Sequence, residues 1–166
     1  MPQVTDLSGL LLDCVQDLHA AETQALDRLP AVLEAVTSPG LRAALDWHQT
    51  ETREQARRLE AVAALLRQPA SGPACLWAAG ILDDAERDTR SVAPGPLLDA
   101  ALIGAVRKLE QAEVVSYETA VGVARALGFP EAVRLLEQTH AEERAMDTRL
   151  AGLLAAALGD AARDAT

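Results

Sequence analysis

Glutamate residues in the middle of apolar helical stripes are the feature of this sequence that could do chemistry. Glu22 lies one turn from Leu18 and one turn from Leu26, so a helix here would place its carboxylate at the centre of the apolar face. Glu113 follows Leu109 in the same way. Because glutamate is rarely buried unless it is paired or bound to a metal, these two residues are candidates for a buried site.

Two further apolar stripes carry acids at the same level. One passes through His48 with Glu51 on its flank, and in the other Glu142 and Glu143 lie astride the stripe, whereas Glu54 is expected to point outward. One carboxylate from each of four helices cannot stay ionised in a dry core unless a cation neutralises them. Carboxylates with an imidazole suit iron or manganese, so we expect a metal centre at this level.

The three histidines have different expected roles. His48 faces inward one turn before Glu51 and is either the nitrogen ligand of the centre or a hydrogen-bonded core residue beside it. His19, one turn before Glu22, lies near the edge of its stripe, and His140 is expected at the surface. Packing is the expected role of three further side chains, Trp47, Trp77 and Met146.

Proline and glycine divide the chain into four long amphipathic helices and a short fifth one. We expect a single domain spanning residues 1–166, with one helical hairpin at about 5–68, a crossover at about 69–96 and a second hairpin at about 97–159. The crossover holds the short helix, at about Cys75 to Arg90. Short turns within the hairpins and a long link between them are the connectivity of an all-α, ferritin-like four-helix bundle.

Local signals fix the expected helix ends. Thr5 is the candidate N-cap of the first helix, whose last turns Pro30 should kink or perturb. Ser38 and Pro39 are a cap and a first helical residue for the second helix, and Pro130 opens the last one.

The two hairpins are related in sequence. Shifting the chain on itself by 91 residues, without gaps, superposes acids, prolines and leucines of both halves. The matched pairs are Leu18 with Leu109, Glu22 with Glu113, Val32 with Val123, Pro39 with Pro130, Leu45 with Leu136, Glu51 with Glu142, and Leu59 with Leu150. Chance matching in a sequence rich in Ala, Leu and Glu is the alternative, and the shared prolines argue against it.

Composition restricts the partners of the protein. The 166 residues carry 15 basic and 25 acidic side chains, a net charge of −10, so nucleic acid and anionic membrane surfaces are poor partners. Cys14 and Cys75 form neither a disulfide framework nor a zinc motif and are expected to be buried free thiols. The N-terminus lacks the charged region of a signal peptide and no apolar run has the length of a membrane span, so a cytoplasmic location is expected.

Four segments of the chain resemble the YciE/YciF ferroxidase-like family. They are LLDCVQDLHAAETQAL, VTSPGLRAAL with WHQTETREQARRLE, ALIGAVRKLEQAEVVSYETA and LLEQTHAEERAMDTRL, and together they span roughly residues 8 to 155. The resemblance implies a ferritin-like bundle, a homodimer, a dimetal site and an association with stress response. It carries onto this chain the site residues Glu22, His48, Glu51, Gln55, Glu110, Glu113, Glu142, Glu143 and Asp147.

The chain departs from the family pattern at the centre itself. His19 stands where the family usually has a tyrosine, and Glu110-Gln111-Ala112-Glu113 stands where it has E-H-Y-E. The Glu-x-x-His pairs common in ferritin-like centres are absent as well, since Glu51 is followed at three residues by Glu54. These differences predict a centre that has more carboxylates, binds metal more weakly, or prefers a different metal.

Two functions of different class are consistent with these features. The first is a dimetal carboxylate oxidoreductase with iron or manganese and no organic cofactor, which oxidises Fe(II) or reduces O2 or peroxide. The second is a non-catalytic interaction or scaffold bundle with a vestigial site, in which His, Gln, Arg107 or Lys108 and water satisfy the inward acids. The ligands alone do not separate ferroxidase from peroxide-removing activity.

Overall fold

The structure is a computed structural model that describes residues 3–164, and every regular element in that range is a helix. The helices are α1 (Leu7–Ala35), α2 (Pro39–Leu65), α3 (Leu76–Ser91), α4 (Pro96–Ala126) and α5 (Pro130–Asp164). None of them, within the described residues, is both long enough and apolar enough to cross a membrane.

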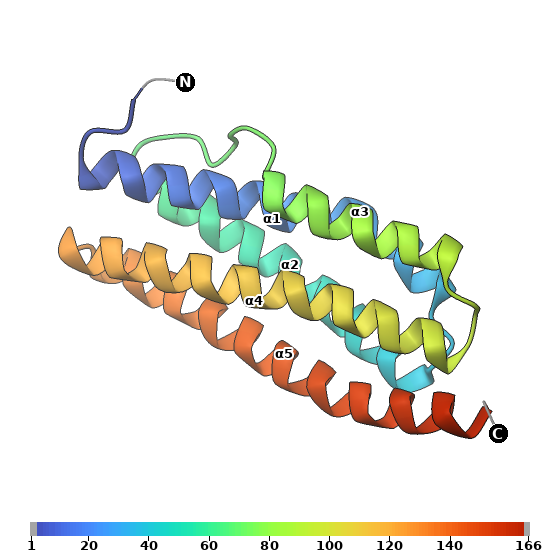
Figure 1. Cartoon of the computed structure of the whole chain (residues 1–166). Coiled ribbons are helices and arrows are strands. Elements are labelled where there is room, and N and C mark those ends of the chain that lie inside the picture. Colours follow the sequence, from blue (N-terminus) through green and yellow to red (C-terminus); the bar gives the residue numbers. More distant parts are fainter. Residues whose placement is uncertain (1–2, 165–166) are drawn as a thin grey trace.

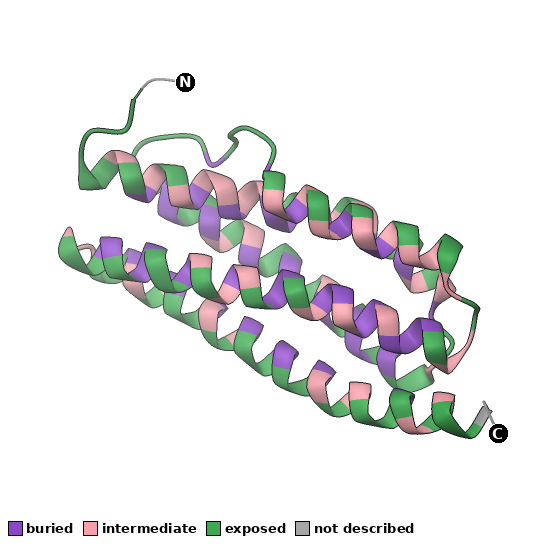
Figure 2. Cartoon of the chain, in the orientation of Figure 1, coloured by how far each residue is buried: buried purple, intermediate pink, exposed green. Residues whose placement is uncertain are grey.

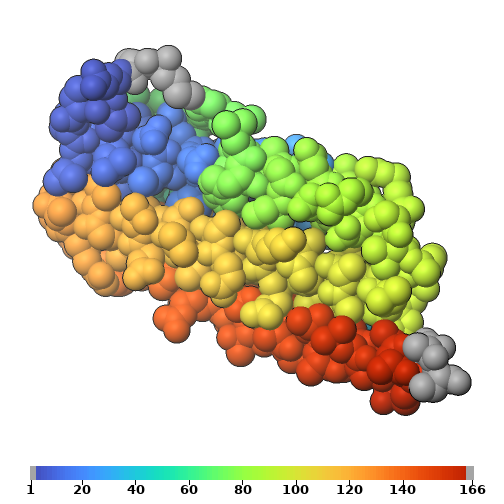
Figure 3. Space-filling model, viewed as in Figure 1, coloured from blue at the N-terminus to red at the C-terminus, as the bar shows by residue number. Residues whose placement is uncertain are grey.

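The four long helices form an antiparallel bundle with α3 on its side (Figure 1). Around the bundle α1 packs on α2, α2 on α5, α5 on α4, and α4 on α1, while α3 contacts both α1 and α4. The chain therefore consists of two helical hairpins joined by a long crossover, as the sequence predicts. The bundle is elongated, and α3 lies over the seam between α1 and α4 (Figures 1 and 3).

Capping residues set the beginnings of the first two helices. Asp6 caps α1 by accepting a 2.7 Å hydrogen bond from the backbone N–H of Gly9, so the predicted cap at Thr5 is wrong by one residue. Ser38 caps α2 and Pro39 is its first residue, as expected.

Pro30 lies inside α1, which continues to Ala35. Two further helix boundaries differ from expectation by small amounts. The crossover helix begins at Leu76, with Cys75 as its N-cap residue. The last helix continues beyond residue 159 to Asp164.

Buried residues lie on the inward faces of the helices (Figure 2), and the apolar ones among them form two clusters along the bundle axis. The first cluster includes Leu41, Leu45, Leu102, Val106, Leu109, Met146 and Leu150, and the second includes Leu11, Val15, Leu18, Leu59, Val62, Ala120 and Leu136. Where the two clusters meet, each long helix carries buried polar residues: Glu22 on α1, His48, Thr52 and Gln55 on α2, Glu110 and Glu113 on α4, and Thr139 and Glu143 on α5. Met146 packs in the core as expected, whereas Trp47 does not, because 59% of its surface is exposed.

Asp99 joins the α1–α2 turn to α4. Its buried carboxylate accepts hydrogen bonds from the backbone N–H groups of Thr37 and Ser38, both at 2.8 Å, and from the Thr37 hydroxyl at 2.7 Å. These bonds satisfy a turn that has few other backbone partners and fix where the first hairpin meets the second.

Replacing Asp99 with alanine should lower the free energy of unfolding by roughly 3 kcal/mol, since it leaves buried donors without an acceptor. Urea denaturation of the two proteins measures this difference. Asp46→Ala is the matched control because Asp46 is exposed on α2, and its effect should stay within about 0.5 kcal/mol. Equal effects of the two substitutions would show that the Asp99 contacts do not stabilise the hairpin junction.

Candidate metal centre

Five ionisable side chains fill the polar layer between the two apolar clusters. They are Glu22 of α1, His48 of α2, Glu110 and Glu113 of α4, and Glu143 of α5, and none is more than 2% exposed. Each lies at the inward stripe of its helix, because helical periodicity aligns it with leucines one or two turns away. All four long helices of the bundle therefore contribute to one buried site.

The closest grouping in this layer consists of His48, Glu110 and Glu143. Each offers one ligand atom, and these three atoms lie within 4.8 Å of one another. His48 Nε2 is 3.1 Å from Glu110 Oε1. This spacing places one nitrogen and two carboxylate oxygens around a common point.

Tyr117 of α4 contacts Glu22. Its buried hydroxyl donates a 2.6 Å hydrogen bond to Glu22 Oε1, which fixes the carboxylate of Glu22. Tyr117 was absent from the predicted site residues. The signal that could have found it is its position one turn after Glu113 on the same apolar stripe.

Apart from the 3.1 Å contact between His48 and Glu110, most polar atoms at this level of the bundle form no hydrogen bond within the described residues. These atoms are His48 Nδ1, Gln55 Oε1 and both carboxylate oxygens of Glu110, Glu113 and Glu143. A buried polar atom without a partner typically costs about 1–3 kcal/mol, and native proteins contain few of them. Eight such atoms at one level of the bundle fit a group that binds several carboxylate oxygens at once.

The environment makes these acids hard to ionise. Burial, followed by repulsion from Glu143, raises the pKa of Glu22 to about 8. Burial is also the main cause that raises the pKa of Glu110 to about 8, with repulsion from Glu22 adding to it. The pKa values of Glu113 and Glu143 are raised well above the usual range, first by burial and then by the neighbouring carboxylates.

The donor set suits hard or borderline divalent cations. Cations at the centre would neutralise four carboxylates that otherwise repel one another. Oxygen donors with a single imidazole match iron and manganese better than zinc or copper, which favour more nitrogen or sulfur. The residues present therefore fit the metal that the sequence leads us to expect.

Two acids predicted for the site are paired with arginines at its edge. Both Glu142 oxygens accept from Arg58, at 2.5 and 2.9 Å, and Glu142 is partly exposed. Asp147 accepts from Arg107 at 2.7 Å and from Gln111 at 2.8 Å. The Arg107 guanidinium lowers the pKa of Asp147. These two carboxylates already have arginine partners, whereas no arginine or lysine of the described residues pairs with an acid of the buried layer.

Glu51 and Gln55 lie on the α2 side of the layer. Glu51 is half-buried, forms no ion pair or hydrogen bond with the described residues, and lies near enough to Glu110 to disfavour its ionisation. Gln55 is buried and donates to Glu142 at 3.3 Å. Glu51 and Glu142 thus lie at the partly exposed edge of the layer, which we call the rim. On α5 the buried acid of the layer is Glu143.

The remaining polar residues lie away from the buried acids. His19 Nε2 is 3.6 Å from Glu60, and His140 is partly exposed. Arg107, one of the cations expected to satisfy the inward acids in a scaffold, pairs with Asp147 instead, and Lys108 is exposed.

Comparisons with known proteins agree with this fold. The family described as Domain of unknown function (DUF892) matches residues 6–163. Protein YciF of Escherichia coli (strain K12) is 29% identical over 148 residues, which cover 89% of each chain. The crystal structure of the E. coli stress protein YciF superposes with a TM-score of 0.90 and 27% identity, covering 94% of this chain and 99% of that one.

Two further solved structures are similar. YcfI from Rhodopseudomonas palustris, for which a structural role has been suggested, has a TM-score of 0.86 and 32% identity, over 90% of this chain and 95% of that one. A protein from Xanthomonas campestris pv. campestris has a TM-score of 0.76 at 20% identity, over 96% and 99% of the two chains, and supports the fold alone.

Chelator-treated protein should become less stable as the pH rises from 6 to 8. The ordinary pKa of glutamate is near 4.5 and the folded values of Glu22 and Glu110 are about 8, so the folded state holds protons that the unfolded state has released. For each acid that is protonated in the folded state and ionised in the unfolded state, the free energy of unfolding falls by about 1.4 kcal/mol per pH unit across this window. The stabilisation is complete below the unfolded pKa and is lost as the pH passes through the folded one.

Urea denaturation at several pH values measures this slope. Glu110→Gln, which removes one of the titrating acids but keeps the shape of the side chain, should flatten it. A stability that is constant or rises over the same interval would mean that the acids are ionised in the folded protein and have partners there.

Proposed function

This chain belongs to the family described as Domain of unknown function (DUF892), and from that premise we propose that it is a dimetal carboxylate protein that oxidises Fe(II) or reduces O2 or peroxide. The observation that carries the proposal is the set of buried oxygens on Glu110, Glu113 and Glu143 that accept no hydrogen bond from the described residues. Retaining such groups inside an apolar core costs stability, and cation binding offsets that cost.

The residues of the layer have distinct roles in this proposal. His48, Glu110 and Glu143 hold one cation, because one ligand atom of each already lies within 4.8 Å of the others. Glu22 and Glu113 provide the carboxylates for the second cation. Iron or manganese, when bound, would supply the one-electron steps that no side chain of the layer can perform.

The chain controls the surroundings of the cations. Tyr117 holds one oxygen of Glu22 through its hydroxyl and leaves the other free to bind. The apolar clusters on both sides of the layer exclude water along the bundle axis, which strengthens the attraction between carboxylates and cations. Arg58 and Arg107 neutralise the rim acids Glu142 and Asp147 and keep them out of the centre.

A protective role under stress is the physiological setting that we propose. YciF, with which the chain shares 29% identity, is described as a stress protein. Removal of free Fe(II) or of peroxide would limit oxidative damage in the cell, and the same centre serves either reaction.

A non-catalytic structural role is the second candidate, because YcfI has been suggested to be a structural protein. In such a protein the acids of the layer would stay protonated and hydrogen-bonded to one another or to water. Elemental analysis of protein purified without chelator separates the two candidates, since only the first retains iron or manganese in amounts near two ions per chain.

Adding Mn(II), or Fe(II) without oxygen, should raise the melting temperature of chelator-treated protein. A cation that binds only the folded state at a hundred times its Kd adds about 2.7 kcal/mol, or roughly 5–10 °C for a chain of this size. The shift should disappear in Glu110→Gln/Glu113→Gln and persist in the control Glu54→Ala, whose side chain is exposed on α2. An unchanged melting temperature in the parent protein would favour the structural candidate.

Aerobic addition of Fe(II) should produce ferric absorbance faster with the parent protein than with Glu110→Gln/Glu113→Gln. Removing two of the four buried carboxylates should slow the oxidation by at least about tenfold, to the rate in buffer. If both proteins bind metal equally but neither accelerates oxidation, the centre has no ferroxidase activity.

A further inference from the structure

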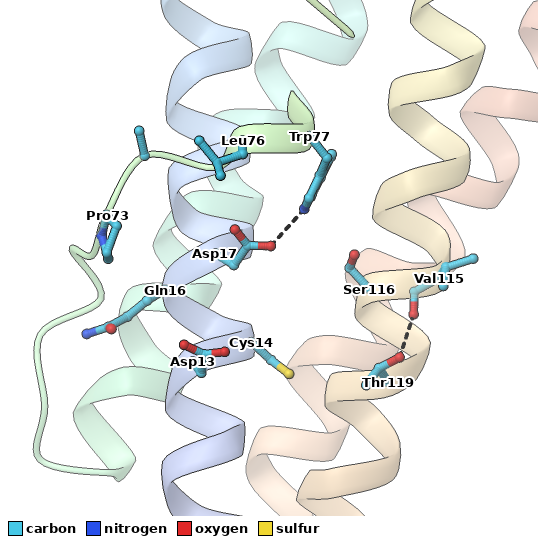
Figure 4. Close-up of a pocket in the computed structure, with 11 residues that line it drawn as sticks. Asp13, Cys14, Gln16, Asp17, Pro73, Leu76, Trp77, Val115, Ser116 and Thr119 are labelled. Atoms are coloured by element: carbon cyan, nitrogen blue, oxygen red, sulfur yellow. Dashed lines mark hydrogen bonds between the residues drawn. The ribbon is translucent and has the colours of Figure 1, made fainter. Parts of the chain in front are cut away.

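A groove of about 600 Å³ lies over the seam between α1 and α4, next to the segment that precedes α3 (Figure 4). Asp13 and Asp17 face it from α1, Val115 and Ser116 from α4, and Trp77 closes one side. Asp13 forms no hydrogen bond or ion pair with the described residues, whereas Asp17 accepts a 2.7 Å hydrogen bond from the Trp77 indole N–H. Among the described residues no basic side chain lines the groove, so its two carboxylates give it a negative potential.

The floor of the groove lies close to the metal centre along both helices. On α4, Ser116 follows Glu113 by three residues, about 4.5 Å along the axis. On α1, Asp17 precedes Glu22 by five residues, about 7.5 Å. The groove and the buried layer are thus separated by little more than one helical turn.

Cys75 is a buried residue directly between Ala74 and Leu76 in the chain, both of which line the groove. Its thiol is fully buried and faces Asp17, and burial followed by this carboxylate raises the pKa of the thiol to about 12. On its other side Cys75 lies near enough to Glu113 to disfavour ionisation of that acid, although burial and the other carboxylates contribute more. Cys75 is therefore near both Asp17, which lines the groove, and Glu113, which belongs to the layer.

We propose that this groove is the entrance through which divalent cations reach the buried centre, with Asp13 and Asp17 collecting the ion and Cys75 lining its path to Glu113. The proposal rests on the proposed function, because an entrance needs a centre that binds cations. A neutral thiol suits this position because its sulfur binds a passing cation only weakly. A thiolate would bind the ion tightly and retain it.

The other seams beside the layer are less suited to a cation. Arg58 bridges α2 and α5 through Glu142, and Arg107 bridges α4 and α5 through Asp147. A divalent cation approaching along either seam meets a guanidinium, whereas the groove presents carboxylates. Glu51, which is half-buried on the α2 side without a partner among the described residues, marks the competing route.

Rapid-mixing measurements of Mn(II) uptake by metal-free protein, followed by loss of the free-ion EPR signal, test the entrance. Asp13→Asn/Asp17→Asn should slow uptake by about tenfold at low ionic strength, and less in high salt, while leaving the final stoichiometry unchanged. The amide oxygen that Asp17→Asn introduces can still accept from the Trp77 indole N–H, so the wall of the groove is kept. Asp27→Asn/Glu34→Gln removes the same charge from positions of α1 outside the groove and should leave the rate unaltered.

Blocking the groove provides a second measurement. Cys14 lines the groove and is partly exposed, whereas Cys75 is buried, so a bulky maleimide should react at Cys14 and slow uptake. The same reagent should have no effect on Cys14→Ser.

The outcomes separate the entrance from the function. If Asp13→Asn/Asp17→Asn and the maleimide-labelled protein bind Mn(II) with full stoichiometry and at the parent rate, the entrance proposal is wrong while the proposed function stands. If only Glu51→Gln slows Mn(II) uptake, the cation enters on the α2 side instead. If the parent protein binds no Mn(II) at equilibrium, the proposed function fails and the entrance fails with it.

Discussion

Burial of four carboxylates and an imidazole in one layer is the constraint on which the rest of the structure depends. Glu22, Glu110, Glu113 and Glu143 together with His48 lie between two apolar clusters and are almost wholly excluded from solvent. Such a layer destabilises the folded state, because desolvation opposes ionisation and the acids repel one another. A protein of this size retains it only if the surrounding packing is strong and if the layer serves a function.

The bundle supplies that packing in three ways. Apolar clusters on either side of the layer bury leucine and valine from all four long helices. Asp99 holds the first hairpin against α4 at one end, through three hydrogen bonds to the α1–α2 turn. At the rim, Arg58 and Arg107 pair with Glu142 and Asp147, so the negative charge of the layer does not extend to the α5 surface.

The two hairpins are similar in fold but have diverged in chemistry. A shift of 91 residues relates the buried Glu22 and Glu113, yet it places Glu110 opposite His19 and Glu143 opposite Thr52. The second hairpin therefore provides three of the four buried acids, and the first provides the one imidazole. The two hairpins thus contribute different donors, with the imidazole of His48 from the first and the Tyr117 hydroxyl from the second.

The sequence by itself determined the four long helices, the crossover helix and the inward positions of Glu22 and Glu113. These features follow from local periodicity and from Pro, Gly and capping residues, which act within a few turns of one chain segment. Only the tertiary structure decided that Glu143 rather than Glu142 is buried, and that Tyr117 reaches Glu22. It also brought Cys75 near both Asp17 and Glu113. These outcomes depend on the rotation and axial register of packed helices, which arise from contacts between residues far apart in the chain, and no spacing within a single helix encodes them.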